Sequence, residues 1–296
     1  MDAGPVAVRI LSFNDFHGHL LPNEDGSGGV AKLASLIDRQ RTTNTLVVSP
    51  GDLVGASPLV SAHFKDQPTI EAMNLLGLDV FGLGNHEFDE GLDELRRLQH
   101  GDPTSGFEGS RFPFLGANVH RGDGVPIFDP YVVKEVGGVE VAFIGLTLED
   151  TKEIVAPDLG DLQFADEVET ISRYVYQLRE RGIQAFVILL HEGGWQKGGI
   201  NDCSDLEGPV VDIVKQLPAE VDVVLSGHTH RTYNCEIDGK LLTAAGSNGK
   251  LLTQVDLEIS PVTRDVIRKS AENLVVDASL PDEPEIARSS PVTSRR

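Results

Sequence analysis

Apolar and polar positions along the chain follow two periods. Short apolar runs rich in β-branched residues predict buried strands, and apolar positions three or four residues apart predict helices with one buried face. Their alternation is typical of an α/β fold. In chain order, we expect strands at 6–13, 45–49, 79–83, 112–119, 139–146, 184–190, 221–225, 241–245 and 251–259, and helices at 30–37, 68–76, 91–98, 165–181 and 209–217.

Five strands, taken in order, each end at side chains that can bind a metal ion. In open α/β sheets such groups gather at the carboxyl ends of strands, so they are expected to converge on one crevice. Asp15 and His17 share a face if strand geometry persists, because side chains two apart point the same way. The candidate ligands are Asp15 and His17, Asp52, Asn85, His191, and His228 and His230.

Each motif alone has an ordinary structural explanation. Asp52 could lie in a simple turn, and His191 could be a satisfied histidine at the edge of the core. The repeated placement at five strand ends favours a metal site instead. Mixed Asp, Asn and His ligation suits Mn, Fe, Co or Zn better than Ca or Mg alone. The ligands suffice for two cations sharing Asp52, about 3.5–4 Å apart, which would activate a bridging hydroxide for in-line displacement at phosphorus.

The stretch from Gly84 to Asp89 adds candidate catalytic groups. Asn85 offers a neutral carbonyl oxygen as a hard ligand. His86 can donate a proton or a hydrogen bond, and Asp89 is close enough in sequence to hold the imidazole and favour its charged form. A capped strand-to-helix turn is the alternative explanation of this stretch taken alone.

Composition narrows the class of protein. The 296 residues can bury a sizeable core, and 40% hydrophobic with 24% charged residues is ordinary for a soluble globular protein. A net charge of -21 argues against a nucleic-acid-binding surface. No apolar run has the roughly 18–20 residues of a membrane span, and residues 1–5 show no signal-peptide pattern. The two cysteines, Cys203 and Cys235, are either disulfide-bonded or buried free thiols.

The motifs together resemble those of a known family, the calcineurin-like metallophosphoesterases. Within it, the sequence is similar to the bacterial secreted group of 5′-nucleotidases, UDP-sugar hydrolases and 2′,3′-cyclic phosphodiesterases. The similarity extends to about residue 277. It rests on Asp15-Phe16-His17-Gly18, Gly51-Asp52, Gly84-Asn85-His86-Glu87-Phe88-Asp89, His191-Glu192-Gly193-Gly194 and Gly227-His228-Thr229-His230.

The resemblance implies a four-layer αββα sandwich of two mixed β-sheets flanked by helices. By the same analogy, Asn85 and His86 contact the substrate, His86 paired with Asp89 stabilises the transition state or protonates the leaving alkoxide, and no phosphoenzyme forms. The ligand sets that it implies are Asp15, His17, Asp52 and His230 for one metal, and Asp52, Asn85, His191 and His228 for the other.

The resemblance also bears on domains and location. Residues 1–277 are expected to form the catalytic domain, and 278–296 a linker-like, disordered tail. In the family a C-terminal nucleotide-binding domain supplies an aromatic stack and arginines, and this chain is expected to lack it. A secreted, periplasmic or cell-surface location is implied, which favours the Cys203–Cys235 disulfide.

The leading hypothesis is a dinuclear metal-dependent phosphoester hydrolase of 5′-nucleotidase type. The alternatives with the same core are a 2′,3′-cyclic-nucleotide phosphodiesterase and a UDP-sugar hydrolase. A non-catalytic metal-binding surface module is the alternative of another class. This alternative is disfavoured because the sequence keeps His86 and every candidate metal ligand of the family motifs.

Overall fold

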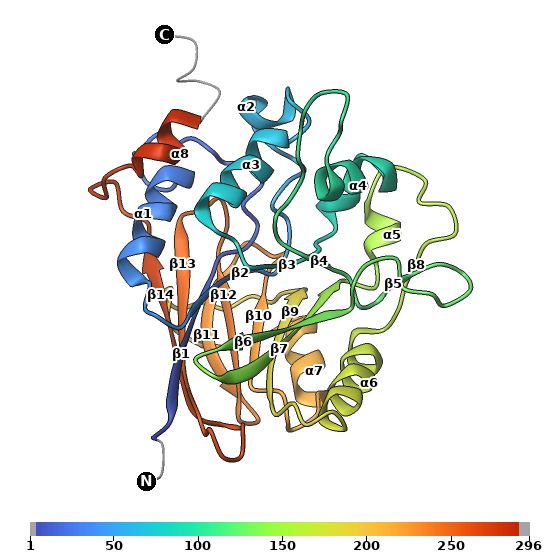
Figure 1. The fold of residues 1–296 in the computed structure, drawn as a ribbon, viewed down its shortest axis with the longest axis vertical. Coiled ribbons are helices and arrows are strands. Elements are labelled where there is room, and N and C mark those ends of the chain that lie inside the picture. Colours follow the sequence, from blue (N-terminus) through green and yellow to red (C-terminus); the bar gives the residue numbers. More distant parts are fainter. Residues whose placement is uncertain (1–3, 290–296) are drawn as a thin grey trace.

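Two six-stranded sheets face each other in the computed structural model, which describes residues 4–289 (Figure 1). The first sheet, in spatial order, contains β14 (Val266–Val275), β13 (Leu251–Ile259), β1 (Val6–Ser12), β2 (Thr45–Ser49), β3 (Val80–Gly82) and β4 (Phe114–Leu115). The second contains β11 (Thr232–Ile237), β12 (Lys240–Ala245), β10 (Val223–Ser226), β9 (Ala185–His191), β7 (Val139–Thr147) and β6 (Tyr131–Val136). A separate pair joins β5 (Val119–His120) to β8 (Gln163–Phe164).

Both sheets are mixed. In the first sheet, β1 to β4 run parallel to one another. β13 is antiparallel to β1, and β14 is antiparallel to β13. In the second, β12, β10, β9 and β7 are parallel, and β11 and β6 add antiparallel edges. The carboxyl ends of the parallel strands therefore lie at one end of each sheet, where the predicted ligands follow.

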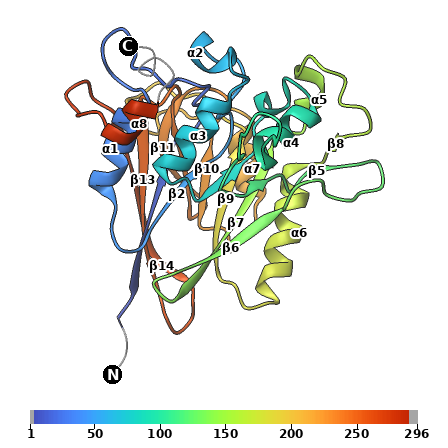
Figure 2. The ribbon, with the colours of Figure 1, turned by 45° about the horizontal axis from the view of Figure 1, so that its top comes forward.

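Helices cover the outer face of each sheet, which completes the expected four-layer αββα sandwich. Figures 1 and 2 show α1, α3, α4 and α8 on the side of the first sheet and α6 and α7 on the side of the second. The helices are α1 (Val30–Gln40), α2 (Leu59–Ala62), α3 (Gln67–Leu76), the 3-10 turn η1 (His86–Phe88), α4 (Leu92–His100), α5 (Thr151–Ile154), α6 (Glu167–Arg179), α7 (Pro209–Gln216) and α8 (Pro284–Ser289).

Three apolar cores fill the spaces between these layers. The middle core packs Ile10 and Val48 of the first sheet with Phe143 and Val187 of the second. Two outer cores seat the helices on the outer faces of the sheets. Strands with both faces buried need apolar side chains at successive positions, which explains the continuous apolar runs in the sequence.

β1 is an internal strand whose neighbours come from distant parts of the chain. It pairs with β2 in parallel and with β13 in antiparallel register, from Val6 opposite Ile259 to Ser12 opposite Thr253. Arg9 of β1 also forms an ion pair with Asp256 of β13, at 2.7 Å. The N-terminal strand is thus completed by residues near the end of the chain.

The structure departs from the sequence expectations mainly at the sheet edges and near residue 280. β6, β8, β11 and β14 were not expected. The single strand expected at 112–119 is instead two short strands, β4 and β5, in different sheets. Part of the segment 278–296, expected to be disordered, is ordered, because α8 buries Ile286 and the preceding loop buries Leu280 in the first outer core. Residues 290–296 lie outside the described residues. Among residues 4–289, no helix has the length and apolar character needed to cross a membrane.

Candidate metal centre

The structure brings the seven predicted ligands together at the carboxyl ends of β1, β2, β3, β9 and β10. Most are buried, although the His230 side chain is 47% exposed. The first sheet contributes the two carboxylates, the Asn85 amide and His17. The second contributes the remaining histidines.

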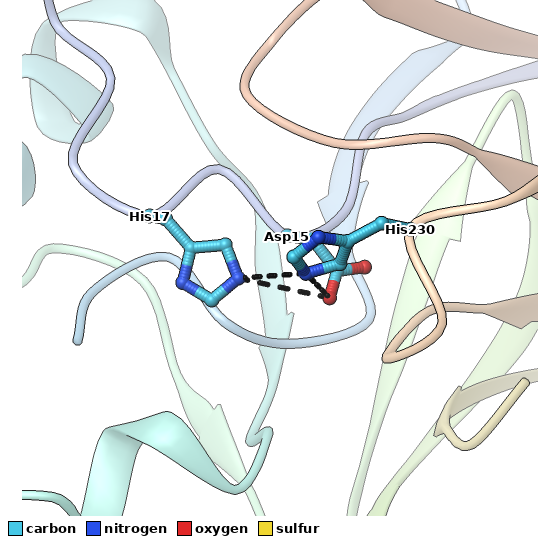
Figure 3. A group of neighbouring side chains, drawn as sticks. All are labelled: Asp15, His17 and His230. Atoms are coloured by element: carbon cyan, nitrogen blue, oxygen red, sulfur yellow. Dashed lines mark hydrogen bonds and ion pairs between the residues drawn. The ribbon is translucent and has the colours of Figure 1, made fainter. Parts of the chain in front are cut away.

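One group combines Asp15, His17 and His230 (Figure 3). The Asp15 Oδ1 atom lies 3.3 Å from His230 Nε2 and 3.9 Å from His17 Nε2. The two Nε2 atoms are 3.0 Å apart. Three ligand atoms from two sheets therefore face one point, and Asp52 Oδ2 lies nearby, 3.7 Å from His17 Nε2.

A second group lies deeper and centres on Asp52 and His191. Asp52 Oδ2 is 2.9 Å from His191 Nε2. Asn85 Oδ1 and His228 Nδ1 are 3.0 Å apart, and the rings of His191 and His228 have centroids 5.4 Å apart. Asp15 Oδ1 is also 4.0 Å from His191 Nε2, so that carboxylate lies between the two groups as Asp52 does.

The orientation of the histidines fits metal binding. His191 Nδ1 is 2.9 Å from the Pro50 carbonyl oxygen, and His17 Nδ1 is 2.9 Å from that of Gly55. A carbonyl only accepts, so each Nδ1 carries a proton and each Nε2 faces the carboxylates as the atom that could bind a cation, the usual orientation of a metal-binding imidazole. His191 Nε2 is buried and lies 2.9 Å from Asp52 Oδ2, without the alignment of a hydrogen bond. The donor set therefore fits divalent cations.

The carboxylates of the site attract positive charge. Burial lowers the pKa of His191, but Asp52, followed by Asp15, outweighs burial and raises that pKa to about 10. A bound cation would take the place of the proton at Nε2. Burial raises the pKa of the Asp52 carboxyl, but the attraction of His191, followed by that of His17, outweighs burial and holds it below its usual range. Burial, together with the charge of His191, lowers the pKa of His228 to about 4. At neutral pH Asp52 is therefore ionised and His228 is neutral, which are the forms that bind metal.

The loops that carry the ligands adopt unusual backbone conformations. β1 ends at Ser12, so the expectation that strand geometry aligns Asp15 with His17 was wrong, and left-handed turns direct both side chains to the site instead. A Cβ at Gly84 would lie 2.2 Å from Asp52 Oδ1, so only glycine permits the close approach there. The ligands with φ between 48° and 67° are Asp15, His17, Asp52, His228 and His230.

His86 lies at the edge of the ligand cluster, with its ring centroid 5.1 Å from that of His17. Its Nδ1 is 2.7 Å from Asp89 Oδ2, and its backbone N–H donates to Asp52 Oδ1 at 3.0 Å. The hydrogen bond to Asp89 is the largest influence on the pKa of His86, and it raises that pKa to about 8 against the effect of burial. The imidazole is then a proton donor at neutral pH, with Nε2 as the available atom.

Sequence reasoning did not identify the role of Glu87. Its buried carboxylate accepts four backbone N–H groups, from Gly84, Asp52, Leu53 and Val54, at 2.7–3.2 Å. Burial, followed by the charge of Asp52, raises the pKa of Glu87, and the donors of Gly84 and Val54 oppose that shift. The carboxylate joins the loops that carry Asp52 and Asn85. Its place inside the Gly84–Asp89 motif was the available signal.

A disulfide supports the other side of the centre. Cys203 in the loop after β9 is bonded to Cys235 on β11, a separation of 32 residues. The bond ties the chain that follows His191 to the strand that follows His230. Of the two states left open by the sequence, the structure contains the disulfide.

Comparisons with known proteins are consistent with this geometry. Residues 8–232 match the family model of the calcineurin-like phosphoesterases. The chain is 35% identical to endonuclease YhcR of Bacillus subtilis, over 93% of this chain and 24% of that protein. It is 34% identical to cell wall protein Lmo0130 of Listeria monocytogenes, over 90% of this chain and 38% of that protein. The chain thus spans well under half the length of these two relatives.

Among solved structures, the 5′-nucleotidase precursor from Thermus thermophilus superposes with a TM-score of 0.81 at 26% identity. The match covers 98% of this chain and 59% of that one. The arrangement of two sheets and flanking helices is therefore shared over essentially the whole chain.

Proposed function

The chain belongs to the calcineurin-like phosphoesterase family, and on that premise we propose that it hydrolyses phosphomonoesters of nucleosides, as a 5′-nucleotidase does. The observation that carries the proposal is the convergence of seven ligand side chains beside the His86–Asp89 pair. The proposed ligand sets are Asp15, His17, Asp52 and His230 for one cation, and Asp52, Asn85, His191 and His228 for the other.

Two bound divalent cations, Mn, Zn, Co or Fe, would supply Lewis acidity and an activated water. The residues of the chain do the rest. Asn85 and His86 orient the phosphoryl group, and Asp89 holds His86 protonated. Water supplies the new oxygen at phosphorus while the bond to the alcohol breaks, and His86 Nε2 gives the leaving oxygen its proton. The proton lost by water restores the imidazolium, so none is consumed at His86.

Similarity to the 5′-nucleotidase precursor of Thermus thermophilus supports the monoester assignment. We propose residues 1–277 as the catalytic domain, with nucleoside specificity increased by a further domain in longer relatives. The similarity to a cell wall protein and the Cys203–Cys235 disulfide support a location outside the cytoplasm, where disulfides persist.

Hydrolysis of phosphodiesters is the second candidate. Its support is the 35% identity to a protein named as an endonuclease. The same ligands can act on a diester, including a 2′,3′-cyclic nucleotide or UDP-glucose. The net charge of -21 favours small diesters over a nucleic-acid polymer.

A substrate panel tests the proposal. The chelated protein is supplied with Mn, Zn or Co and assayed with AMP, UDP-glucose, a 2′,3′-cyclic nucleotide and p-nitrophenyl phosphate. AMP turnover that depends on metal supports the nucleotidase, and preference for the cyclic nucleotide overturns it in favour of the diesterase.

His86→Ala should lower kcat about 10²-fold or more with metals retained, as expected for loss of a general acid. His100→Ala, at the exposed end of α4, is the matched control. No turnover with any metal would indicate a non-catalytic metal-binding module.

A further inference from the structure

A cavity of about 670 Å³ has His86 and Asp89 in its wall. Its other walls are the loop after Asp52, the junction of α2 with α3, and α4. None of the seven metal ligands is among its described lining residues. The cavity is therefore a separate space that adjoins the metal centre at His86.

The position of His86 indicates what the cavity could bind; this argument rests on the proposed phosphoesterase function. Its ring contacts His17 of the ligand cluster and also lines the cavity. Asp89 occupies Nδ1, which leaves Nε2 to protonate the leaving oxygen. The leaving oxygen would therefore lie next to His86. The adjoining cavity is large enough to hold the alcohol group attached to that oxygen. Its volume is within the roughly 300–1,000 Å³ of small-molecule sites.

The walls of the cavity are fixed to one another. Arg97 of α4 donates to the Lys65 carbonyl oxygen at 2.7 Å and to the Glu94 carboxylate on its own helix. Asp66 accepts a 2.6 Å hydrogen bond from Ser61. Lys65 and Asp66 both have left-handed backbone, at φ 52° and 56°, a conformation that persists only where the surroundings enforce it. The space is therefore preformed.

The charge of the lining is negative. Arg97 is paired with Glu94, and His86 with Asp89. Glu90 and Asp93 also line the cavity and form no ion pair with any residue from 4 to 289. Lys65 is the remaining cation among its described lining residues. An anionic group placed here would meet uncompensated carboxylates, whereas hydroxyl and ammonium groups would find acceptors.

We propose that this cavity binds the leaving alcohol of the substrate and selects neutral or cationic alcohols over anionic ones. Monoesters of hydroxyl-rich alcohols, nucleosides included, fit it. Esters whose leaving group carries a carboxylate or a further phosphate do not, so the terminal phosphate of a nucleoside diphosphate is a poor substrate.

Two esters of equal size test this assignment. Glycerol 3-phosphate and 3-phosphoglycerate differ only in the leaving alcohol. Glycerol has a hydroxymethyl group where glycerate has a carboxylate. The wild-type protein, loaded with metal, should favour the glycerol ester by about 10-fold in kcat/KM. Asp93→Lys should lower that preference about 5-fold, mainly through KM for the anionic ester, and the change should shrink in 0.5 M salt. Asp93→Asn keeps the side-chain shape and changes the charge by one unit instead of two. It should therefore change the logarithm of the kcat/KM preference about half as much as Asp93→Lys does.

Glu71→Lys on the neighbouring α3 is the matched control, because Glu71 is exposed as Asp93 is but does not line the cavity. It should leave the preference within about 2-fold. An unchanged preference in both Asp93 variants, or a wild-type preference for 3-phosphoglycerate, overturns the cavity assignment while turnover of p-nitrophenyl phosphate still supports the hydrolase. Absence of metal-dependent turnover with every ester overturns the function and this assignment together.

Discussion

The two sheets contribute unlike halves of the metal centre. The first sheet supplies Asp15 and Asp52, which are essentially inaccessible to solvent, and Glu87 holds the Asp52 loop and the Gly84 backbone through four hydrogen bonds. The second supplies histidines that range from the fully buried His191 to the half-exposed His230. Both carboxylates therefore lie in the first half, and the candidate ligands of the second half are all histidines.

Hydrogen bonds between the sheets hold these halves in register. His191 bonds to the Pro50 carbonyl oxygen of the first half, and the His228 backbone N–H donates to Asp15. Each sheet thus orients ligands on the other. If the proposed cations bind, we expect the carboxylates of the first half to set how much cation charge is neutralised, and the histidines of the second half to enclose the cations.

The largest expected effect comes from removing charge in the first half. Asp52→Asn should reduce turnover at least about 10³-fold, some 4 kcal/mol of transition-state stabilisation. Bound metal should fall below two per chain, because Asp52 lies against ligands of both groups. Metal analysis by mass spectrometry and single-turnover kinetics check this. Two tightly bound metals in the variant would refute the shared role of Asp52.

The next largest effect is expected from weakening the Glu87 hydrogen bonds that hold the ligand loops of the first sheet. Glu87→Gln leaves an amide nitrogen where a carboxylate oxygen accepted two N–H groups, so the free energy of unfolding should fall by about 4 kcal/mol. Metal affinity should drop about 10–100-fold. Urea unfolding and metal titration measure both, with Glu71→Gln as an exposed control. Normal metal affinity would show that Glu87 acts on stability alone.

A comparable change in the second half is the removal of its disulfide. Replacing Cys203 and Cys235 by serine should cost about 3–4 kcal/mol of unfolding free energy on the chain-entropy model. Metal affinity should change less than in Glu87→Gln, because no ligand loop loses hydrogen bonds. Reduced wild-type protein should match the variant. Two alkylatable thiols in unreduced protein would contradict the bond itself.

The smallest expected effect depends on pH and also lies in the second sheet. Burial raises the pKa of Asp222, beside Lys269, to about 6. Since the folded pKa exceeds the unfolded value, the contribution of Asp222 to stability is complete below about pH 4 and is lost as pH rises through 6. Asp222→Asn should therefore gain up to about 3 kcal/mol relative to wild type between pH 4 and 7. Parallel stability profiles for the two proteins would refute this.

The sequence was informative where burial is complete. Strands such as β2 and β9 have apolar side chains on both faces and lead to a candidate ligand, Asp52 after β2 and His191 at the end of β9, so pattern and chemistry agree there. β14 includes Arg268, Lys269 and Glu272 because an edge strand is covered incompletely, and the same exposure hid β6 and β11.

Local geometry at the site was less predictable. No periodicity indicates the left-handed backbone at Asp15 and His17, because tertiary contacts enforce it. The helix at α8 depends on the isolated apolar residue Ile286 among Pro and acidic neighbours, which resemble a disordered segment in composition. In each case the deciding contact comes from residues far along the chain.

The central place of β1 has a consequence for biosynthesis. Its antiparallel partner is β13, and Arg9 and Asp256 are 247 residues apart. At about 5–20 residues per second, the first strand waits roughly 10–50 s for that partner to be made. Such non-local pairing is also slow to form. The apolar β1 segment therefore leaves the ribosome long before β13 can cover it, and we expect the nascent chain to need protection from aggregation until β13 has been synthesised.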